Sequence, residues 1–326
     1  MKSIVLITLL VAELAFLAAT SQPIDAGLLR GLLVQSSPIF FLAIGMTFVI
    51  LTAGIDLSVG SMTALVAAVL ASFPAGGSFW ATAVPAGLAA ALLLGATNGA
   101  LVARLDMPPI VATLGTMLVF RGLAYGILGD SEKGPFAEVP GYFRLGEVEI
   151  LGAVVLVAAV SGGVLYYASR WSRELHMIGG NRIAARYAGV PVLRRQMQVY
   201  TLAGACAFLA AVAYTAQNGS VSASALPELE LKVITAVVLG GTRVQGGSGS
   251  YVGSLLGVFV IALLDEGLRG AKRWGDEHLP FDVSYLRHLA LGALLAGGVG
   301  LHGWWGRRAL RSPRGRDAGT TADGAA

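Results

Sequence analysis

A carboxylate stands between two apolar runs in the stretch FVILTAGIDLSVGSMTAL, residues 48–65. Ionisable side chains inside lipid are costly, so Asp56 marks either a transport pathway or a structural partner. Because it follows a glycine and precedes LSVGS, Asp56 can cap the next helix by accepting amide protons of its first turn, and Ser58 can do the same. The residues favour the cap and leave open a protonatable group in an ion-driven carrier.

The other residues whose side chains could take part in chemistry form no recognisable catalytic set. Arg121, Asp265 and Glu266 lie near the ends of apolar runs, and we favour interfacial anchoring for them. The four histidines are widely separated without a metal-ligand spacing, so no metal site is predicted. The single cysteine, Cys206, lies in an apolar run, which predicts packing rather than a disulfide.

The sequence contains no phosphate-binding loop of the type GxxxxGK[ST] and no GxSxG nucleophile elbow. The glycine-rich stretch GGTRVQGGSGSYVG, residues 240–253, has no lysine to hold a phosphate. We therefore predict that the chain is not an enzyme and holds no cofactor of its own.

The composition predicts an integral membrane protein. Hydrophobic residues make up 55% of the 326 residues and charged residues 13%, with a mean hydropathy of +0.72. A soluble domain is about a quarter charged. The 44 glycines are spread through the apolar blocks, where small residues allow close helix packing. The net charge of +4 comes from arginines in loops, which favours membrane orientation over a nucleic-acid partner.

The apolar blocks predict an all-α membrane protein of about ten transmembrane helices. We expect a transmembrane domain over residues 1–305 and a basic, then disordered tail over 306–326. The first block has a cleaved signal peptide as its alternative, and we favour a retained helix. The predicted segments are 4–20, 28–53, 57–73, 79–103, 108–128, 148–168, 196–216, 230–242, 249–268 and 285–303.

Charge asymmetry predicts the orientation. The two densest arginine clusters, at 169–196 and 306–316, should both be cytoplasmic, and an even number of segments separates them. The acidic connection 129–149 then lies outside, both termini lie inside, and Asp56 follows the cytoplasmic end of the second segment. The stretch 268–282 departs from this rule, because it is basic and yet assigned outside.

The basic loop at 169–196 contains a candidate helix outside the membrane. Asn181 is a plausible cap for it, alanines favour it, and Gly189 ends it. Such a helix suits docking on another protein, with an interfacial helix on anionic lipid as the alternative. Three apolar residues are expected along one side of the helix: Ile183, Tyr187 and Val190.

Four stretches in this order resemble one known family. They are LTAGIDLSVGS (51–61), MPPIVATLGTMLVFRGLAY (107–125), GGNRIAARYAGVPV (179–192) and ITAVVLGGTRVQGGSGSYVGSLLG (234–257). They are similar to stretches of the permease subunits of binding-protein-dependent ABC importers for sugars, the ribose, galactose, xylose, rhamnose and autoinducer-2 type.

The resemblance implies two permeases, identical or related, around one pathway in a bacterial inner membrane. A separate ATP-binding subunit would hold ATP and Mg²⁺ on the cytoplasmic side, and a periplasmic or lipid-anchored sugar-binding protein would deliver the substrate. It implies coupling to the ATPase for a first set of residues: Asn181, Ala184, Ala185, Arg186, Gly189 and Val190. It implies a helix break or structural motif for a second set: Gly54, Asp56, Ser58, Gly60, Gly240, Gly241, Gly246 and Gly247.

The predicted function is therefore import of a monosaccharide or a related polyol-like molecule. Two alternatives are an ion-coupled secondary transporter using Asp56 and a membrane scaffold without transport. Ala262, Asp265 and Glu266 depart from the family pattern, which leaves the sugar and the second permease open. Two substitutions, Gly189→Trp and Ala185→Glu, are expected to uncouple transport without preventing insertion.

Overall fold

The computed structural model describes residues 25–278, 289–290, 292–294, 296–297 and 300. Within this part the chain is helical, with only an isolated bridge between Lys133 and Val221 in extended pairing. This confirms the all-α fold. The predicted first segment and the 306–326 tail lie outside the described residues, as does most of the predicted last segment.

Among the described residues, six helices are long and apolar enough to cross a membrane. The bounds of two of them agree with the predicted segments 79–103 and 148–168, whereas the helix predicted at 196–216 is longer at both ends. The six are α2 (Ala26–Leu51), α4 (Phe79–Ala103), α5 (Pro109–Leu128), α6 (Val148–Ala168), α9 (Val192–Asn218) and the Tyr251–Arg269 part of α11 (Tyr251–His278).

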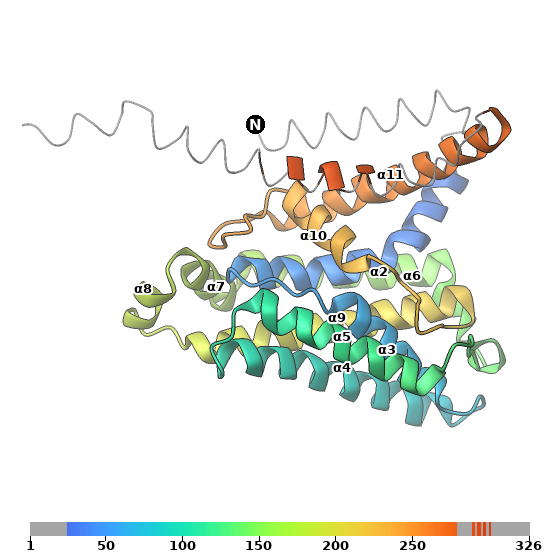
Figure 1. Ribbon diagram of the computed structural model, residues 1–326, viewed down its shortest axis with the longest axis horizontal. Helices are drawn as coiled ribbons and strands as arrows, with labels where there is room; N and C mark the ends of the chain where they lie inside the picture. Colours follow the sequence, from blue (N-terminus) through green and yellow to red (C-terminus); the bar gives the residue numbers. More distant parts are fainter. Residues whose placement is uncertain (1–24, 279–288, 291, 295, 298–299, 301–326) are drawn as a thin grey trace, which may run out of the picture.

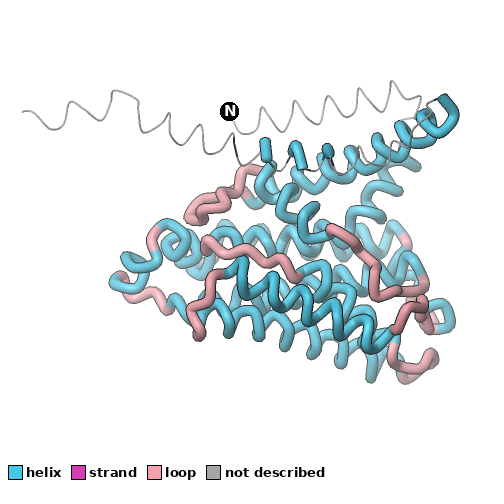
Figure 2. Tube along the Cα trace, viewed as in Figure 1, coloured by secondary structure: helices cyan, strands magenta, loops and turns pink. Residues whose placement is uncertain are grey.

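The helices in the predicted segments 57–73 and 230–242 are short. Helix α3 (Val59–Ala71) has 13 residues and α10 (Leu229–Leu239) has 11. At 1.5 Å per residue they reach about 20 Å and 17 Å, less than a hydrocarbon core of about 30 Å. Irregular stretches, 52–58 and 219–228, precede these helices and are drawn as loops in Figure 2. Both spans are therefore discontinuous.

Helix α9 packs against both α4 and α2 near the middle of the molecule (Figure 1). The helices α4 and α9 approach closely because glycines meet where they cross. A Cβ on Gly95 would lie 3.1 Å from the Cα of Gly204. Helix α3 packs on α5, α9 and α4, whereas α10 and α11 pack on each other and on α2. Small residues at such crossings are typical of membrane helices.

The outer helices expose their apolar side chains. In the most apolar window of α2, 83% of the residues are buried, against 28% in α4 and in α5 and 17% in α6. Exposed apolar surface of this extent fits contact with lipid or with another membrane subunit. The core of the molecule therefore lies around α2, α3 and α9.

Short helices lie at the two ends of the bundle. Helices α7 (Arg170–Gly180) and α8 (Arg182–Tyr187) occupy the end on the left of Figure 1. The 3-10 helices η1 (Phe136–Glu138) and η2 (Phe143–Gly146) belong to the connection between α5 and α6. The basic and acidic loops identified in the sequence therefore fold as structured connections.

Candidate functional site

The carboxylate of Asp56 lies fully buried in the break between α2 and α3. Its Oδ1 atom accepts a hydrogen bond of 2.9 Å from the backbone amide of Ser58 and one of 2.7 Å from the Ser58 hydroxyl. Buried carboxylates are tolerated when donors satisfy their oxygens. The break therefore provides part of the coordination that this charge needs.

Helix α4 supplies the remaining donor. The side-chain amide of Asn98 donates to both oxygens of Asp56, at 3.3 and 3.2 Å, and to the Ser58 hydroxyl at 2.7 Å. The carbonyl oxygen of Asn98 accepts from the Thr116 hydroxyl of α5 at 2.7 Å. These bonds form one chain in which every donor is oriented toward the carboxylate. Asp56 thus connects α3, α4 and α5.

Thr113 of α5 satisfies the irregular backbone beside Asp56. Its hydroxyl oxygen lies 3.1 Å from the amide nitrogen of Leu57, which donates to it, and 3.1 Å from the carbonyl oxygen of Ile55, which can accept from it. Irregular backbone at membrane depth requires such partners, because lipid offers none. The helix break is therefore held by side chains of α5.

The predicted cap at Asp56 is wrong in its detail. The carboxylate binds the amide of Ser58, the residue before the helix, rather than amides of the first helical turn. Ser58 makes no side-chain cap bond either. The physical reason is that Ser58 already has helical dihedral angles, and the donor Asn98 draws the carboxylate toward α4. Asp56 therefore stabilises a turn and an interhelical contact.

The predicted glycines of the break lie at close contacts. A Cβ on Gly54 would be 2.7 Å from the hydroxyl oxygen of Tyr200 in α9. Gly60 lies directly against the carboxyl group of Glu230, at the start of α10. Larger side chains at either position would push these groups away, so both positions require a small residue.

The glycine-rich loop between α10 and α11 closes over the end of the break. The amide of Gly247 donates to the carbonyl oxygen of Leu51 at 3.0 Å. A Cβ on Gly246 would be 2.6 Å from the nitrogen of Ala53, and one on Gly247 would be 2.7 Å from the Cα of Gly180. Three of the predicted glycines have positive φ: Gly241, Gly246 and Gly247. The fourth, Gly240, lies against the backbone of α11.

The tertiary structure therefore brings together three stretches that are distant in the sequence. They are the end of α2 with its break, the junction of α7 with α8, and the glycine-rich loop. Backbones meet here without intervening side chains, so the α7–α8 junction is in direct contact with the end of α2.

The predicted helix in the basic loop is confirmed as α8. The side chain of Asn181 accepts hydrogen bonds of 3.0 Å from the amides of Ile183 and Ala184, as expected for its cap. Gly189 ends the segment with a φ of +79°. Left-handed backbone favours glycine, which has no Cβ.

The exposed side of α8 differs from the predicted one. Ile183 and Tyr187 are 70% and 90% exposed, and Ala184, Arg186 and Gly189 are exposed beside them. The prediction placed Val190 with them, but Val190 is buried, as is Ala185. The left-handed Gly189 turns the chain back, and the amide of Val190 donates to the carbonyl of Ala185 at 3.0 Å.

Ion pairs connect this loop to other parts of the chain. Arg182 of α8 pairs with Asp106, in the connection between α4 and α5, at 2.7 Å. Glu174 of α7 pairs with Arg195 of α9 at 2.5 Å and with Arg170 at 3.2 Å. The hydrogen bond from Arg195 lowers the pKa of Glu174 more than burial raises it. The loop therefore has side-chain contacts with α9 and with the α4–α5 connection.

The polar residues expected as interfacial anchors have protein partners. Arg121 donates to the carbonyl oxygens of Ala223 and Ala225, at 2.7 and 2.9 Å. Asp265 forms an ion pair with Lys232, and Glu266 forms one with Arg269 at 3.0 Å. Cys206 is buried, as predicted. Among the described residues, no three His, Cys, Asp or Glu side chains form a group that could hold a metal ion.

Sequence reasoning missed several residues of this site. Asn98, Thr113 and Thr116 are polar residues inside apolar spans, a signal that could have identified them. The pair of Arg182 with Asp106 has no signal in the sequence, because 76 residues separate its members.

Comparisons with known proteins agree with this architecture. Residues 28–299 match the family described as the permease component of a branched-chain amino acid transport system. No solved structure matches the chain.

Three characterised relatives illustrate the similarity. The ribose import permease protein of Escherichia coli (strain K12) is 36% identical over 278 residues, covering 82% of this chain and 85% of the relative. The ribose import permease protein of Bacillus subtilis (strain 168) is 38% identical over 232 residues, covering 70% and 72%. The autoinducer 2 import system permease protein LsrC of Klebsiella pneumoniae is 37% identical over 239 residues, covering 71% and 68%. The chain therefore belongs to this family of multi-pass transport permeases.

Proposed function

We propose that the chain is the permease subunit of an ATP-driven, binding-protein-dependent importer of a monosaccharide or a related polyol-like molecule. The names of the relatives support this substrate class, since they import ribose, fructose or autoinducer 2. The observation that carries the proposal is α8, a capped helix outside the long apolar spans whose apolar side chains are exposed.

Helix α8 docks on a separate ATP-binding subunit, which holds ATP and Mg²⁺. Ile183 and Tyr187 provide the apolar contact, and the exposed Arg186 lies beside them. An aromatic anchor with a neighbouring arginine is the usual composition of a binding hot spot. The buried Ala185 and Val190 instead fix α8 to its own subunit. Of the six predicted coupling residues, the exposed ones are the candidates for direct contact.

Movement of α8 reaches the helix break by two routes. One runs through the α7–α8 junction and the glycine-rich loop, where Gly247 binds Leu51 at the end of α2. The other runs through Arg182 and Asp106 to α5, whose Thr113 binds the break. Closure of the ATPase would thereby switch the permease between inward-facing and outward-facing states, a coupling of nucleotide state to pathway access.

Two permeases, identical or related, would form the path together, and a periplasmic or lipid-anchored sugar-binding protein would load it from outside. The α7–α8 end is cytoplasmic in this proposal, as is the 306–316 cluster, because both are rich in arginine. The protein then lies in a bacterial inner membrane with both termini inside.

An ion-coupled carrier using Asp56 is the rival. The carboxylate of Asp56 already accepts hydrogen bonds from Ser58 and Asn98, which gives it a structural role without a transported ion. The named relatives are import permeases. Both observations favour the ATP-driven importer.

Uptake of labelled ribose or fructose into proteoliposomes tests the proposal. The liposomes contain the permease with its ATP-binding subunit, and the binding protein is added outside. We expect uptake only when internal ATP and the binding protein are both present, and no effect of a protonophore. Uptake that persists without ATP and collapses with the protonophore would establish the carrier instead.

A further inference from the structure

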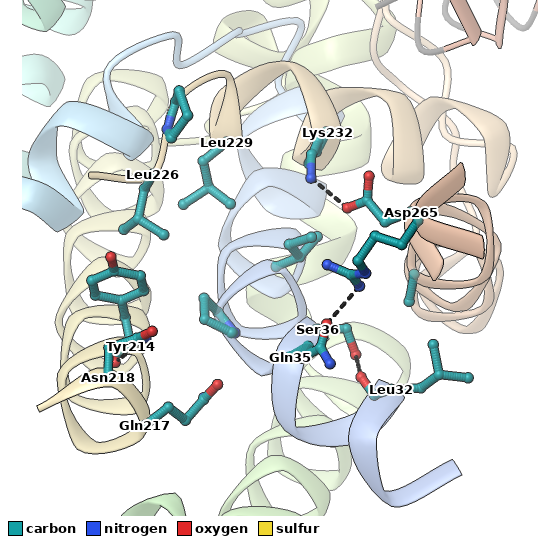
Figure 3. Close-up of a pocket in the computed structure, with 15 residues that line it drawn as sticks. Leu32, Gln35, Ser36, Tyr214, Gln217, Asn218, Leu226, Leu229, Lys232 and Asp265 are labelled. Carbon is teal, nitrogen blue, oxygen red and sulfur yellow. Dashed lines mark hydrogen bonds and ion pairs between the residues drawn. The ribbon is translucent and has the colours of Figure 1, made fainter. Parts of the chain in front are cut away.

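A cavity of about 330 Å³ lies among α2, α9, α10 and α11 (Figure 3). Gln35 of α2 lines it and lies 16 residues before Leu51, a separation of about 24 Å along the helix. The α5–α6 connection reaches the same end of the bundle, since Lys133 pairs with Val221 just beyond α9. In the proposed orientation the cavity therefore lies in the outer half of the membrane.

An irregular backbone forms one side of the cavity. Helix α10 begins only at Leu229, and the preceding residues Leu226 and Glu228 have φ of +58° and +57°. Positive φ is unfavourable for bulky residues and tends to occur at functional sites. Discontinuous backbone at membrane depth is tolerated where it lines a cavity or is covered by protein. Leu226 and Leu229 line the cavity.

The wall formed by α9 presents polar groups that have no hydrogen-bond partner in the described part of the chain. The Tyr214 hydroxyl makes no hydrogen bond within the described part of the chain. Gln217 and Asn218 donate through their amide nitrogens to Ser37 and to the Tyr214 carbonyl, which leaves their carbonyl oxygens as acceptors. Figure 3 shows these three side chains on the α9 side, across from Gln35 and Lys232. Such groups require water or a ligand.

Each cationic side chain that lines the cavity has a carboxylate partner. Lys232 pairs with Asp265, and Arg269 pairs with Glu266 and also donates to Gln35 at 2.5 Å. A cation that is already paired attracts an anionic ligand less strongly than an unpaired one does. Hydrocarbon is unsuitable too, because it would leave the Tyr214 hydroxyl and the amide oxygens without partners. A neutral molecule with several hydroxyl groups satisfies the polar wall, and its C–H faces suit the leucine side chains.

We infer that this cavity binds a small neutral polyhydroxylated molecule, a monosaccharide or polyol, within a single permease subunit. Its volume is at the lower end of the range of about 300–1,000 Å³ for ligand pockets, which suits one sugar ring rather than an oligosaccharide. The identification of this molecule with the imported substrate rests on the proposed function. The binding itself does not.

Cysteine protection tests the inference on the full-length permease in nanodiscs, without its partners. Asn218→Cys places a thiol at an exposed position of the cavity wall, and the wild type is the blank because its only cysteine is buried. Ser131→Cys provides an exposed thiol outside the cavity lining. The probes are D-ribose, D-fructose and ribose 5-phosphate. We expect the neutral sugars to slow maleimide labelling of the Asn218→Cys variant saturably, by about fivefold or more, and to leave labelling of Ser131→Cys unchanged.

Two further variants distinguish binding in the cavity from indirect effects. Ala262→Trp fills the cavity and should abolish protection. Tyr214→Phe removes a hydroxyl that forms no hydrogen bond with the described residues, so the fold stays intact, and it should raise the half-protecting concentration about fivefold to tenfold. The inference would be overturned if the neutral sugars protected the Tyr214→Phe variant as well as the variant that keeps Tyr214, or if ribose 5-phosphate protected as well as ribose. Labelling that depends only on the lipid headgroups would also overturn it. None of these readouts needs ATP, so failure of the importer proposal would be seen separately in the uptake assay.

Discussion

Replacement of Tyr187 by alanine is the sharpest test of the docking role of α8. The side chain is 90% exposed, so its removal leaves the fold almost unchanged. The sequence-based choice Ala185→Glu lacks this property, because Ala185 is only 2% exposed and a carboxylate there would disturb the packing of α8. Gly189→Trp would strain a backbone with a φ of +79°.

The size of the effect follows from the exposed area. An aromatic side chain presents about 150–250 Å². Burial of nine-tenths of it at about 25 cal/mol per Å² gives an upper limit of about 3–6 kcal/mol. Because association offsets part of this gain, we expect about 2 kcal/mol, or roughly a thirtyfold weaker complex. For Ile183→Ala, with 70% exposure, about 1–2 kcal/mol is expected.

The assay is a titration of the nanodisc-embedded permease with its ATP-binding subunit, read by fluorescence anisotropy. Tyr187→Phe keeps the ring and should retain most of the affinity. Tyr167→Ala is the matched control, a tyrosine 60% exposed on α6 rather than on α8. An unchanged dissociation constant for Tyr187→Ala, with intact thermal stability, would refute the docking assignment.

Three other predictions follow from the site. Asp56→Asn places an amide nitrogen opposite the amide nitrogen of Asn98, so two donors face each other and we expect a loss of about 1–3 kcal/mol in the free energy of unfolding. The double variant Asp56→Asn/Asn98→Asp should recover part of this loss. Equal melting temperatures of the wild type and the single variant would contradict the prediction. Asp106→Asn breaks an exposed ion pair that contributes up to about 1 kcal/mol. Uptake per ATP hydrolysed should therefore fall by up to about fivefold while binding of the ATP-binding subunit persists. A weakened complex with that subunit would argue against transmission through this pair. Because the pKa of Glu174 is below its usual value near 4.5, its contribution is fully present above that value and is lost as pH falls through the lowered pKa. The hydrogen-exchange protection factors of residues 170–180, which are corrected for the intrinsic exchange rate at each pH, should therefore stay constant from about pH 8 to 5. A loss of protection near neutral pH would exclude Glu174 as the anchor.

The membrane class, most of the helices and the presence of α8 follow from the amino-acid sequence alone. These features depend on composition, apolar block length and local turn chemistry, which act over a few neighbouring residues. The cap at Asn181 and the end at Gly189 are local in the same sense. The predicted face of α8 was wrong at Val190 because helical periodicity cannot anticipate the turn at Gly189.

The way Asp56 is held, and the stretches that meet at the α8 end, depend on the packing of the whole chain. The partner of Asp56 is Asn98, 42 residues away, and the glycine-rich loop meets the end of α2 almost 200 residues after it in the chain. The short lengths of α3 and α10 also depend on such contacts, since irregular backbone persists in a membrane protein only where other helices supply its hydrogen bonds. Interactions of this kind are set by helix packing, which no local pattern of residues encodes.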